Sequence, residues 1–214
     1  MRNKEKEFLC GLLAALFSPP EKEATEEMRA GQAPSFFLQN ISSWGGESAF
    51  LKAFQSPTES EDLFRVLQNE YDRLFLNPRG ASVSLVESFY KSWTDDPKCR
   101  LSFAREKGFI MGDAALHLLA LYENSGLQVA EEFQSRPDHL AVELEFLSLL
   151  YRMSAGRAIK KFIDDHLDWL PQLKEKLNQA QAHPIYSGAL EALCLFLAGE
   201  RVRLEMEDGT KSIH

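Results

Sequence analysis

Apolar residues recur at intervals of three or four along most of the 214-residue chain, which is the spacing of helices that bury one face. The pattern is clearest over residues 8–17, 63–75, 116–122, 140–150, 159–177 and 186–197. Strand-like segments do not alternate with these helices, and no run of β-branched residues stands out. We therefore predict an all-α protein, a single helical bundle of about ten helices.

Breaks in the pattern divide the chain. Ser18-Pro19-Pro20 ends the first helix, Thr58 and Glu61 have the spacing of a capping box, and Gly199 marks the end of the last clear helix. Residues 81–93 are the least helical part, an extended segment or a loop. If the bundle has two lobes, they cover about residues 1–126 and 137–200 and join at a hinge near residues 126–137. Residues 201–214 are polar and are expected to form a loose tail.

The net charge of −8 argues against nucleic acid as a partner, because affinity for phosphate backbones comes mainly from clustered Lys and Arg, and no such cluster stands out. The three cysteines are far apart and form no C-x-x-C pair, so we expect neither a disulfide framework nor a zinc site, and a reducing cytoplasm is the simplest location. The apolar run over residues 8–17 imitates a signal peptide. It is about half the length that spans a bilayer, acidic residues precede it, and we expect a buried helix there and no membrane insertion.

Catalytic motifs are missing from the sequence. There is no phosphate-binding G-x-x-x-x-G-K-[ST] loop, no G-x-G-x-x-G after a strand, no H-E-x-x-H and no G-x-S-x-G. The nearest approach to a metal cluster is Asp164, Asp165, His166 and Asp168, but adjacent helical positions point in different directions. We predict that the protein is not an enzyme and has no metal or cofactor.

One short motif, Pro137-Asp138-His139, allows two interpretations. As a helix start, Ser135 and Asp138 have capping-box spacing, and proline is common in a first helical turn. As a working site, an imidazole that titrates near neutrality stands beside a carboxylate at the predicted hinge.

A set of motifs in a fixed order resembles the TorD/DmsD/NarJ family of maturation chaperones for molybdenum oxidoreductases. Residues 137–147 resemble the family's D-H-L-x-x-E-L-x-F-L helix, the most specific piece, and the resemblance extends over about residues 8–198. The other matching pieces are residues 70–75 followed by Asn77-Pro78 (E-Y-x-x-L-F), residues 87–90 (E-S-x-Y), Tyr122 with Gly126-Leu127, His166-Leu167 with residues 169–171, and Tyr186 with Leu190.

The resemblance implies a cytoplasmic chaperone that binds the twin-arginine signal peptide of a molybdoenzyme catalytic subunit precursor. It would hold the apoenzyme until the molybdenum cofactor is inserted, before export or assembly. Its fold would be TorD/DmsD-like. A basic pair followed by an apolar stretch needs an apolar groove with acidic groups at one end. The expected peptide-binding residues are Pro137, Asp138 and His139 at the hinge, Glu87, Tyr90 and Trp93 on the irregular segment, and Tyr71, Leu74 and Phe75 as an apolar wall, although Leu74, Phe75 and Trp93 are also good core residues.

Two other hypotheses remain open. A helical adaptor would dock folded proteins through an apolar patch and would be indifferent to an arginine pair in a leader. A nucleotide-handling enzyme would bind GTP without a recognisable phosphate loop, which calorimetry with GTP tests. The oligomeric state is expected to be a monomer or a lobe-swapped dimer.

Overall fold

The computed structural model describes residues 1–30, 35–36, 63–77 and 82–211. Eight α-helices lie in this part of the chain, where about ten were predicted for the whole, and the all-α prediction is confirmed. The helices are α1 Asn3–Phe17, α2 Lys22–Ala30, α5 Leu63–Tyr71, α6 Asp113–Asn124, α7 Leu140–Arg152, α8 Gly156–His166, α9 Leu170–Gln179 and α10 Pro184–Lys211. The short elements are the π-helix η1 Asp72–Leu76 and the 3-10 helices η2 Glu87–Phe89 and η3 Glu131–Phe133.

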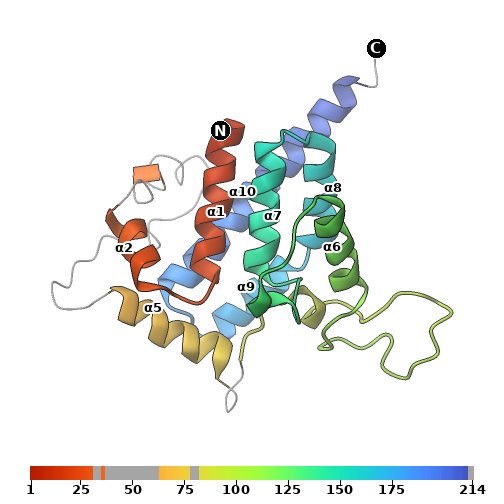
Figure 1. Cartoon of the computed structure of the whole chain (residues 1–214), viewed down its shortest axis with the longest axis horizontal. Coiled ribbons are helices and arrows are strands. Elements are labelled where there is room, and N and C mark those ends of the chain that lie inside the picture. The colour runs from red at the N-terminus through yellow and green to blue at the C-terminus, as the bar shows by residue number, and fades with distance from the viewer. Residues whose placement is uncertain (31–34, 37–62, 78–81, 212–214) are drawn as a thin grey trace.

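Helices α1 and α7 pack along each other at the centre of the bundle, with α10 behind them (Figure 1). Both contribute fully buried leucines, among them Leu9 and Leu13 on α1 and Leu144 and Leu147 on α7. This burial of apolar area is the main force that joins segments more than 120 residues apart.

A buried polar clasp adds direction to this packing. The ammonium group of Lys6 on α1 lies 2.7 Å from the carboxylate of Glu200 on α10. The hydroxyl of Tyr151 on α7 donates a hydrogen bond of 2.9 Å to the same carboxylate. Because a buried charge is stable only when it is paired and hydrogen-bonded, these contacts fix how α1, α7 and α10 are aligned.

The N-terminal apolar run forms a packed core helix, as predicted. Helix α1 ends at Phe17, where the Ser18 N–H still donates to the carbonyl of Ala14 (3.0 Å) and the next two residues, Pro19 and Pro20, have no N–H to donate. Among the helices in the described ranges, none is long and apolar enough to cross a membrane. The capping box at Thr58 and Glu61 lies outside the described residues.

The prediction that Gly199 ends the last helix is wrong, because α10 continues through it to Lys211, into the segment expected to be a loose tail. Glycine inside a helix costs only about 1 kcal/mol relative to alanine, which neighbouring contacts can offset. Here Arg203 pairs with Glu200 (2.9 Å) and Glu207 (2.5 Å), one helical turn away in each direction. Leu204 is buried and ties this part of the helix to the core. The division into two lobes stays a prediction.

Replacing Gly199 by alanine is expected to raise the free energy of unfolding by about 1 kcal/mol, because a methyl group there meets open space and removes backbone freedom from the unfolded chain. Urea unfolding followed by circular dichroism measures the change. Gly126→Ala is the matched control. Gly126 has a φ of +72°, so alanine there should lower the free energy of unfolding. A loss of stability in Gly199→Ala would contradict a continuous helix at that position.

Candidate functional site

The irregular segment predicted over residues 81–93 is held against the start of α7. An antiparallel bridge joins Val86 to His139. The N–H of Leu140 donates to the carbonyl of Leu85 (2.8 Å), and the N–H of Glu87 donates to the carbonyl of Asp138 (2.9 Å). Segments about 50 residues apart in sequence therefore meet at one buried junction.

Asp138 locks this junction through its side chain. One carboxylate oxygen accepts a hydrogen bond from the Ser88 N–H (2.8 Å) and a second, short one from the Ser88 hydroxyl. Burial raises the pKa of Asp138, although the two bonds from Ser88 oppose that shift. The capping box predicted for Ser135 and Asp138 is wrong, because the carboxylate is used by Ser88 and not by the helix.

His139 caps α7 in its place. Its Nδ1 accepts a hydrogen bond from the N–H of Ala141 (3.2 Å), and its ring contacts Phe133 at a centroid distance of 4.8 Å. Burial, with a smaller contribution from the Arg136 charge, lowers the pKa of His139 to about 3. The imidazole is therefore neutral at physiological pH, as an acceptor at a helix N-terminus must be.

A chain of polar side chains leads from the surface into the junction. Nδ1 of His117 lies 2.8 Å from Nε2 of His166, and Nδ1 of His166 lies 3.0 Å from a carboxylate oxygen of Glu87. The Lys91 ammonium group contacts Glu87 and Asp168, at 2.6 Å each. Glu87 is fully buried, so these partners are what makes its burial tolerable.

Glu143, one turn into α7, is the most isolated carboxyl group at the junction. It is fully buried, and neither carboxylate oxygen has a hydrogen-bond partner within the described residues. Burial, together with the neighbouring Glu87 and Asp138 charges, raises its pKa well above the usual range. In the described ranges, no group of three or more His, Cys, Asp or Glu side chains is arranged to hold a metal ion.

The structure places the nine predicted binding residues in three separate groups. The first group meets at the junction and is buried, and it consists of Pro137, Asp138, His139, Glu87 and Tyr90. The second group is Tyr71, Leu74 and Phe75. The rings of Tyr71 and Phe75 contact Tyr186 of α10, and Leu74 is buried in the core. The third group is Trp93 alone, whose ring contacts Phe103.

Tyr90 shows how thoroughly the junction group is used by the fold. Its ring stacks on Trp169 at 5.0 Å, and its hydroxyl donates to the carbonyl of Ser84 (2.7 Å). Peptide binding by the nine residues stays a prediction.

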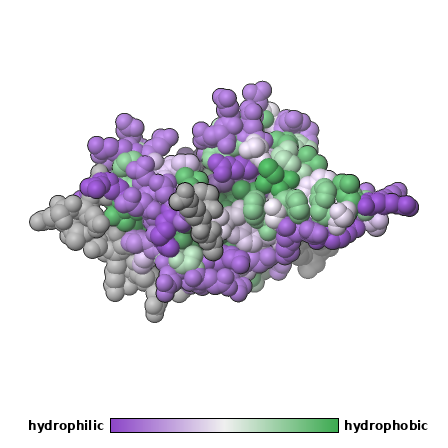
Figure 2. Space-filling model, turned by 90° about the horizontal axis from the view of Figure 1, so that it is seen from below, coloured by the Kyte–Doolittle hydropathy of each residue, from purple (hydrophilic) through white to green (hydrophobic). Residues whose placement is uncertain are grey.

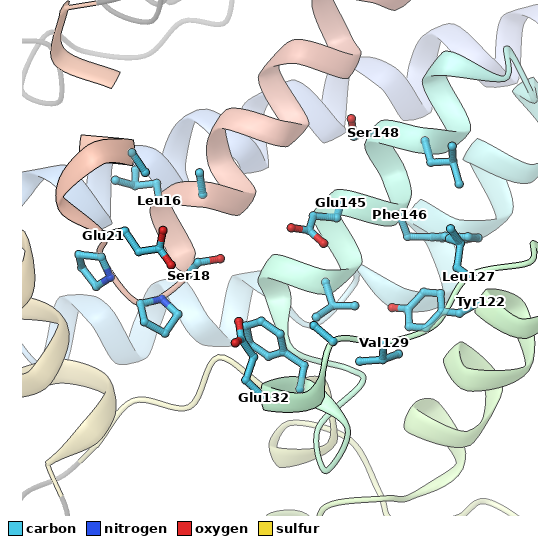
Figure 3. Close-up of a pocket in the computed structure, with 18 of the residues that line it drawn as sticks. Leu16, Ser18, Glu21, Tyr122, Leu127, Val129, Glu132, Glu145, Phe146 and Ser148 are labelled. Carbon is cyan, nitrogen blue, oxygen red and sulfur yellow. The ribbon is translucent and has the colours of Figure 1, made fainter. Parts of the chain in front are cut away.

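The described part of the chain forms an open cavity of about 680 Å³ beside α7, which we call the α7 cavity. Its floor is the outward stripe of α7, and its walls are the turn between α1 and α2 and the segment over residues 127–133 (Figure 3). Its lining is mainly apolar and includes Leu16, Met28, Leu67, Val129, Phe133, Val142, Phe146 and Leu149. None of the nine predicted residues lines it.

Three carboxyl groups, Glu21, Glu132 and Glu145, line the α7 cavity, and we call them its acidic rim. Figure 3 shows Glu145 extending from α7 toward the turn that carries Ser18 and Glu21, with Glu132 on the neighbouring segment. Partial burial and the Glu132 charge raise the pKa of Glu145. At the far end of the stripe, Arg152 is already paired with Glu7 (2.7 Å), so the cavity has an acidic region and no free basic counterpart within its described lining.

Sequence reasoning missed this cavity. The sequence contains one weak signal for it, a stripe of mixed apolar and charged residues on a helix whose other faces are apolar. The stripe consists of Val142, Glu145, Leu149 and Arg152. The walls come from segments far away in the sequence, and no local pattern predicts which segments these are.

Comparison with known proteins gives a consistent result. The family model described as nitrate reductase delta subunit matches residues 43–182, which is more than half of the chain. A protein of Vibrio cholerae named chaperone protein TorD is 30% identical over 132 residues, 56% of this chain and 60% of that protein. The chain therefore matches 60% of the length of that relative.

Two further relatives extend the picture. A chaperone protein TorD of Shewanella piezotolerans is 25% identical over 188 residues, 86% of this chain and 85% of that protein. A selenate reductase assembly chaperone protein of Thauera selenatis is 34% identical over 90 residues, 36% of this chain and 47% of that protein. A crystal structure from Archaeoglobus fulgidus, provisionally described as a redox enzyme maturation protein, has the same fold, with a TM-score of 0.55 at 22% identity over 94% of this chain and 93% of that one.

Replacing Asp138 by alanine is expected to lower the free energy of unfolding by about 3 kcal/mol, because it leaves the buried Ser88 groups without their acceptor. Urea unfolding measures the loss, and Asp72→Ala, at an exposed position, serves as the control. Unchanged stability in Asp138→Ala would show that the junction does not depend on this carboxylate.

The depressed pKa of His139 gives a pH dependence with a defined sign. The unfolded chain takes up a proton on this histidine below about pH 6.5, whereas the folded chain takes it up only near pH 3. Stability is therefore lost as the pH falls, by about 2 kcal/mol between pH 7 and pH 5. We expect His139→Asn, which keeps a capping acceptor, to lack this part of the loss. The raised pKa values of Asp138 and Glu143 make the folded state more stable as the pH falls, which is the opposite effect. This contribution is present in both proteins, so it largely cancels when the two pH profiles of unfolding free energy are subtracted. Parallel pH profiles for the two proteins would refute the assignment.

Proposed function

This chain belongs to the TorD/DmsD/NarJ family, and from that membership we propose that it is a maturation chaperone for a molybdenum-containing oxidoreductase. In this proposal it binds the twin-arginine leader of the catalytic subunit precursor in the cytoplasm. It holds the apoenzyme until the cofactor is inserted and only then allows export or assembly. It catalyses no reaction itself.

Two facts about relatives support the chaperone role. Proteins similar to this chain over most or part of its length are named chaperones, and one of them is named for the assembly of selenate reductase. The name of the Thauera selenatis protein gives a redox enzyme, selenate reductase, as what it assembles.

The observation that carries the leader-binding step is the composition of the α7 cavity. A twin-arginine leader has a basic pair followed by an apolar stretch. The cavity offers apolar walls and an acidic rim within one volume of about 680 Å³, which is in the range of pockets that enclose ligands. It lies open, whereas the motif residues at the junction are buried.

The acidic rim is suited to guanidinium groups. No ion pair within the described residues uses Glu21, Glu132 or Glu145, so their charges are not neutralised by the fold. The pKa of Glu145 is raised because burial and the charge of Glu132 both disfavour its ionised form. An arriving arginine relieves that repulsion and can donate two parallel hydrogen bonds to one carboxylate.

Replacing Glu145 or Glu132 by glutamine is expected to weaken binding of a fluorescently labelled twin-arginine leader about tenfold, equivalent to about 1.4 kcal/mol. The loss arises because the arginine then meets a neutral amide oxygen in place of an opposite charge. Fluorescence anisotropy at low salt measures the dissociation constant. Glu131→Gln is the matched control, because Glu131 is exposed on the same 3-10 helix and does not line the cavity.

The leader provides the second half of this test. Exchanging its arginine pair for two glutamines should weaken binding to the unaltered protein and leave binding to Glu145→Gln less affected. Equal affinity of both leaders for the unaltered protein would favour the adaptor hypothesis, in which an apolar patch docks a folded protein without reading the pair.

A further inference from the structure

The loop over residues 93–112, which we call the projecting loop, connects η2 to α6 and extends away from the helices on the right of Figure 1. Hydrogen bonds close its base. The N–H of Trp93 donates to the carbonyl of Glu106 (3.0 Å), and the N–H of Asp113 donates to the carbonyl of Trp93 (2.8 Å). Gly112 lies so close that a Cβ there would be 2.4 Å from the Trp93 carbonyl oxygen. The loop is therefore a built element with a fixed base.

This fixed loop presents large apolar side chains to solvent. Leu101 is 50% exposed, Phe109 40% and Ile110 48%. The ring of Phe103 contacts the rings of both Trp93 and Phe109. Figure 2 shows hydrophobic residues gathered on the half of the molecule toward which the loop extends. An apolar group on an ordered loop is costly to expose, and such patches mark interaction surfaces.

The projecting loop as a whole has four basic and three acidic residues, because Asp95 and Asp96 lie near its base, but its outer part is basic. Residues 97–110 contain four basic residues, Lys98, Arg100, Arg105 and Lys107, and one acidic residue, Glu106, in a chain whose net charge is −8. The partner that fits it is therefore apolar with an acidic margin. The described part of this chain contains a surface of that chemistry, the α7 cavity with its acidic rim.

We propose that the projecting loop of one copy docks into the α7 cavity of a second copy. Lys98 and Arg100 would face the acidic rim, while Leu101 and its apolar neighbours would enter the cavity. The loop does not fill the cavity of its own chain, because none of the loop residues lines that cavity. The loop lies on one side of α7, whereas α1 and α2 lie on the other side (Figure 1). Loop and cavity are different surfaces, so the contact is heterologous and joins copies head to tail.

The docked loop would occupy the place of the leader. Lys98 and Arg100 followed by Leu101 present basic and then apolar groups, the same order as in a twin-arginine leader. Self-association would then cover the cavity when no client is present, and a leader would release the copies. This consequence rests on the proposed function, whereas the contact between copies does not.

A charge-swap experiment on the full chain tests the contact. In the first variant the loop is reversed by Lys98→Glu and Arg100→Glu, and in the second the rim is reversed by Glu132→Lys and Glu145→Lys. Sedimentation velocity at increasing concentration should show self-association of the unaltered protein. Its dissociation constant should rise at least about tenfold in each variant alone. Mixing the two variants should restore association, because each loop then meets a cavity of opposite charge, and the restoration also shows that both variants are folded.

The control variant combines Lys4→Glu with Arg157→Glu, two exposed positions away from both surfaces, with the same change in net charge as the loop variant. It should associate like the unaltered protein. A protein that stays monomeric at every concentration, association that survives loop reversal, or a mixture that fails to associate would each overturn the proposed contact. If the loop variant sediments with the same mass as the unaltered protein but captures a client apoenzyme less well, the loop is a surface for the client and not for a second copy.

The leader separates this proposal from the proposed function. Anisotropy in dilute protein reports leader binding by itself. One outcome is that the leader binds the dilute protein and yet, at saturating concentration, leaves the associated copies intact. In that case the loop does not use the α7 cavity, and the chaperone proposal stands. If the leader does not bind at all, leader recognition fails, and the contact between copies is decided by the charge-swap mixture alone.

Discussion

The buried carboxylate of Asp138 accepts two hydrogen bonds from Ser88. The arrangement of the helices around α7 depends on this contact. It is expensive to break, because both partners lie away from water. It fixes the segment after η1 against the start of α7, so that Glu87 can reach His166 on α8 and Tyr90 can stack on Trp169. One face of α7 is thereby committed to the interior, and the opposite stripe is left as the floor of the α7 cavity.

The helical architecture was predictable because periodic apolar residues are a local signal. The first helix, its end at Ser18 and the irregular segment before α6 follow from spacing and from proline chemistry. The partner of Asp138 was not predictable in this way. Ser135 offered a local explanation three residues away, whereas the true partner, Ser88, is 50 residues distant. Gly199 misled for a similar reason, since its neighbours Glu200, Arg203 and Leu204 hold the helix through it.

The site divides along the same line. Family motifs drew attention to Asp138, His139 and Glu87, and the structure gives these residues buried positions with fixed partners. Glu145 and Glu132 line the open cavity but belong to no recognisable sequence motif. The sequence around a surface glutamate is the same whether or not a distant segment packs beside it to form a cavity. The motifs therefore identify the scaffold of the fold well. The binding surface emerges only when α1, α2 and the segment before α7 come together around the helix.

The pairing of α1 with α7 also has a consequence for synthesis on the ribosome. The apolar face of α1 leaves the ribosome before α7, which follows more than 120 residues later. At ordinary elongation rates of about 5–20 residues per second, that interval is on the order of ten seconds. During this time Leu9, Leu13 and their neighbours have no α7 to cover them. A protein with a proposed role in shielding the unfinished state of another polypeptide thus passes through an exposed, unfinished state of its own.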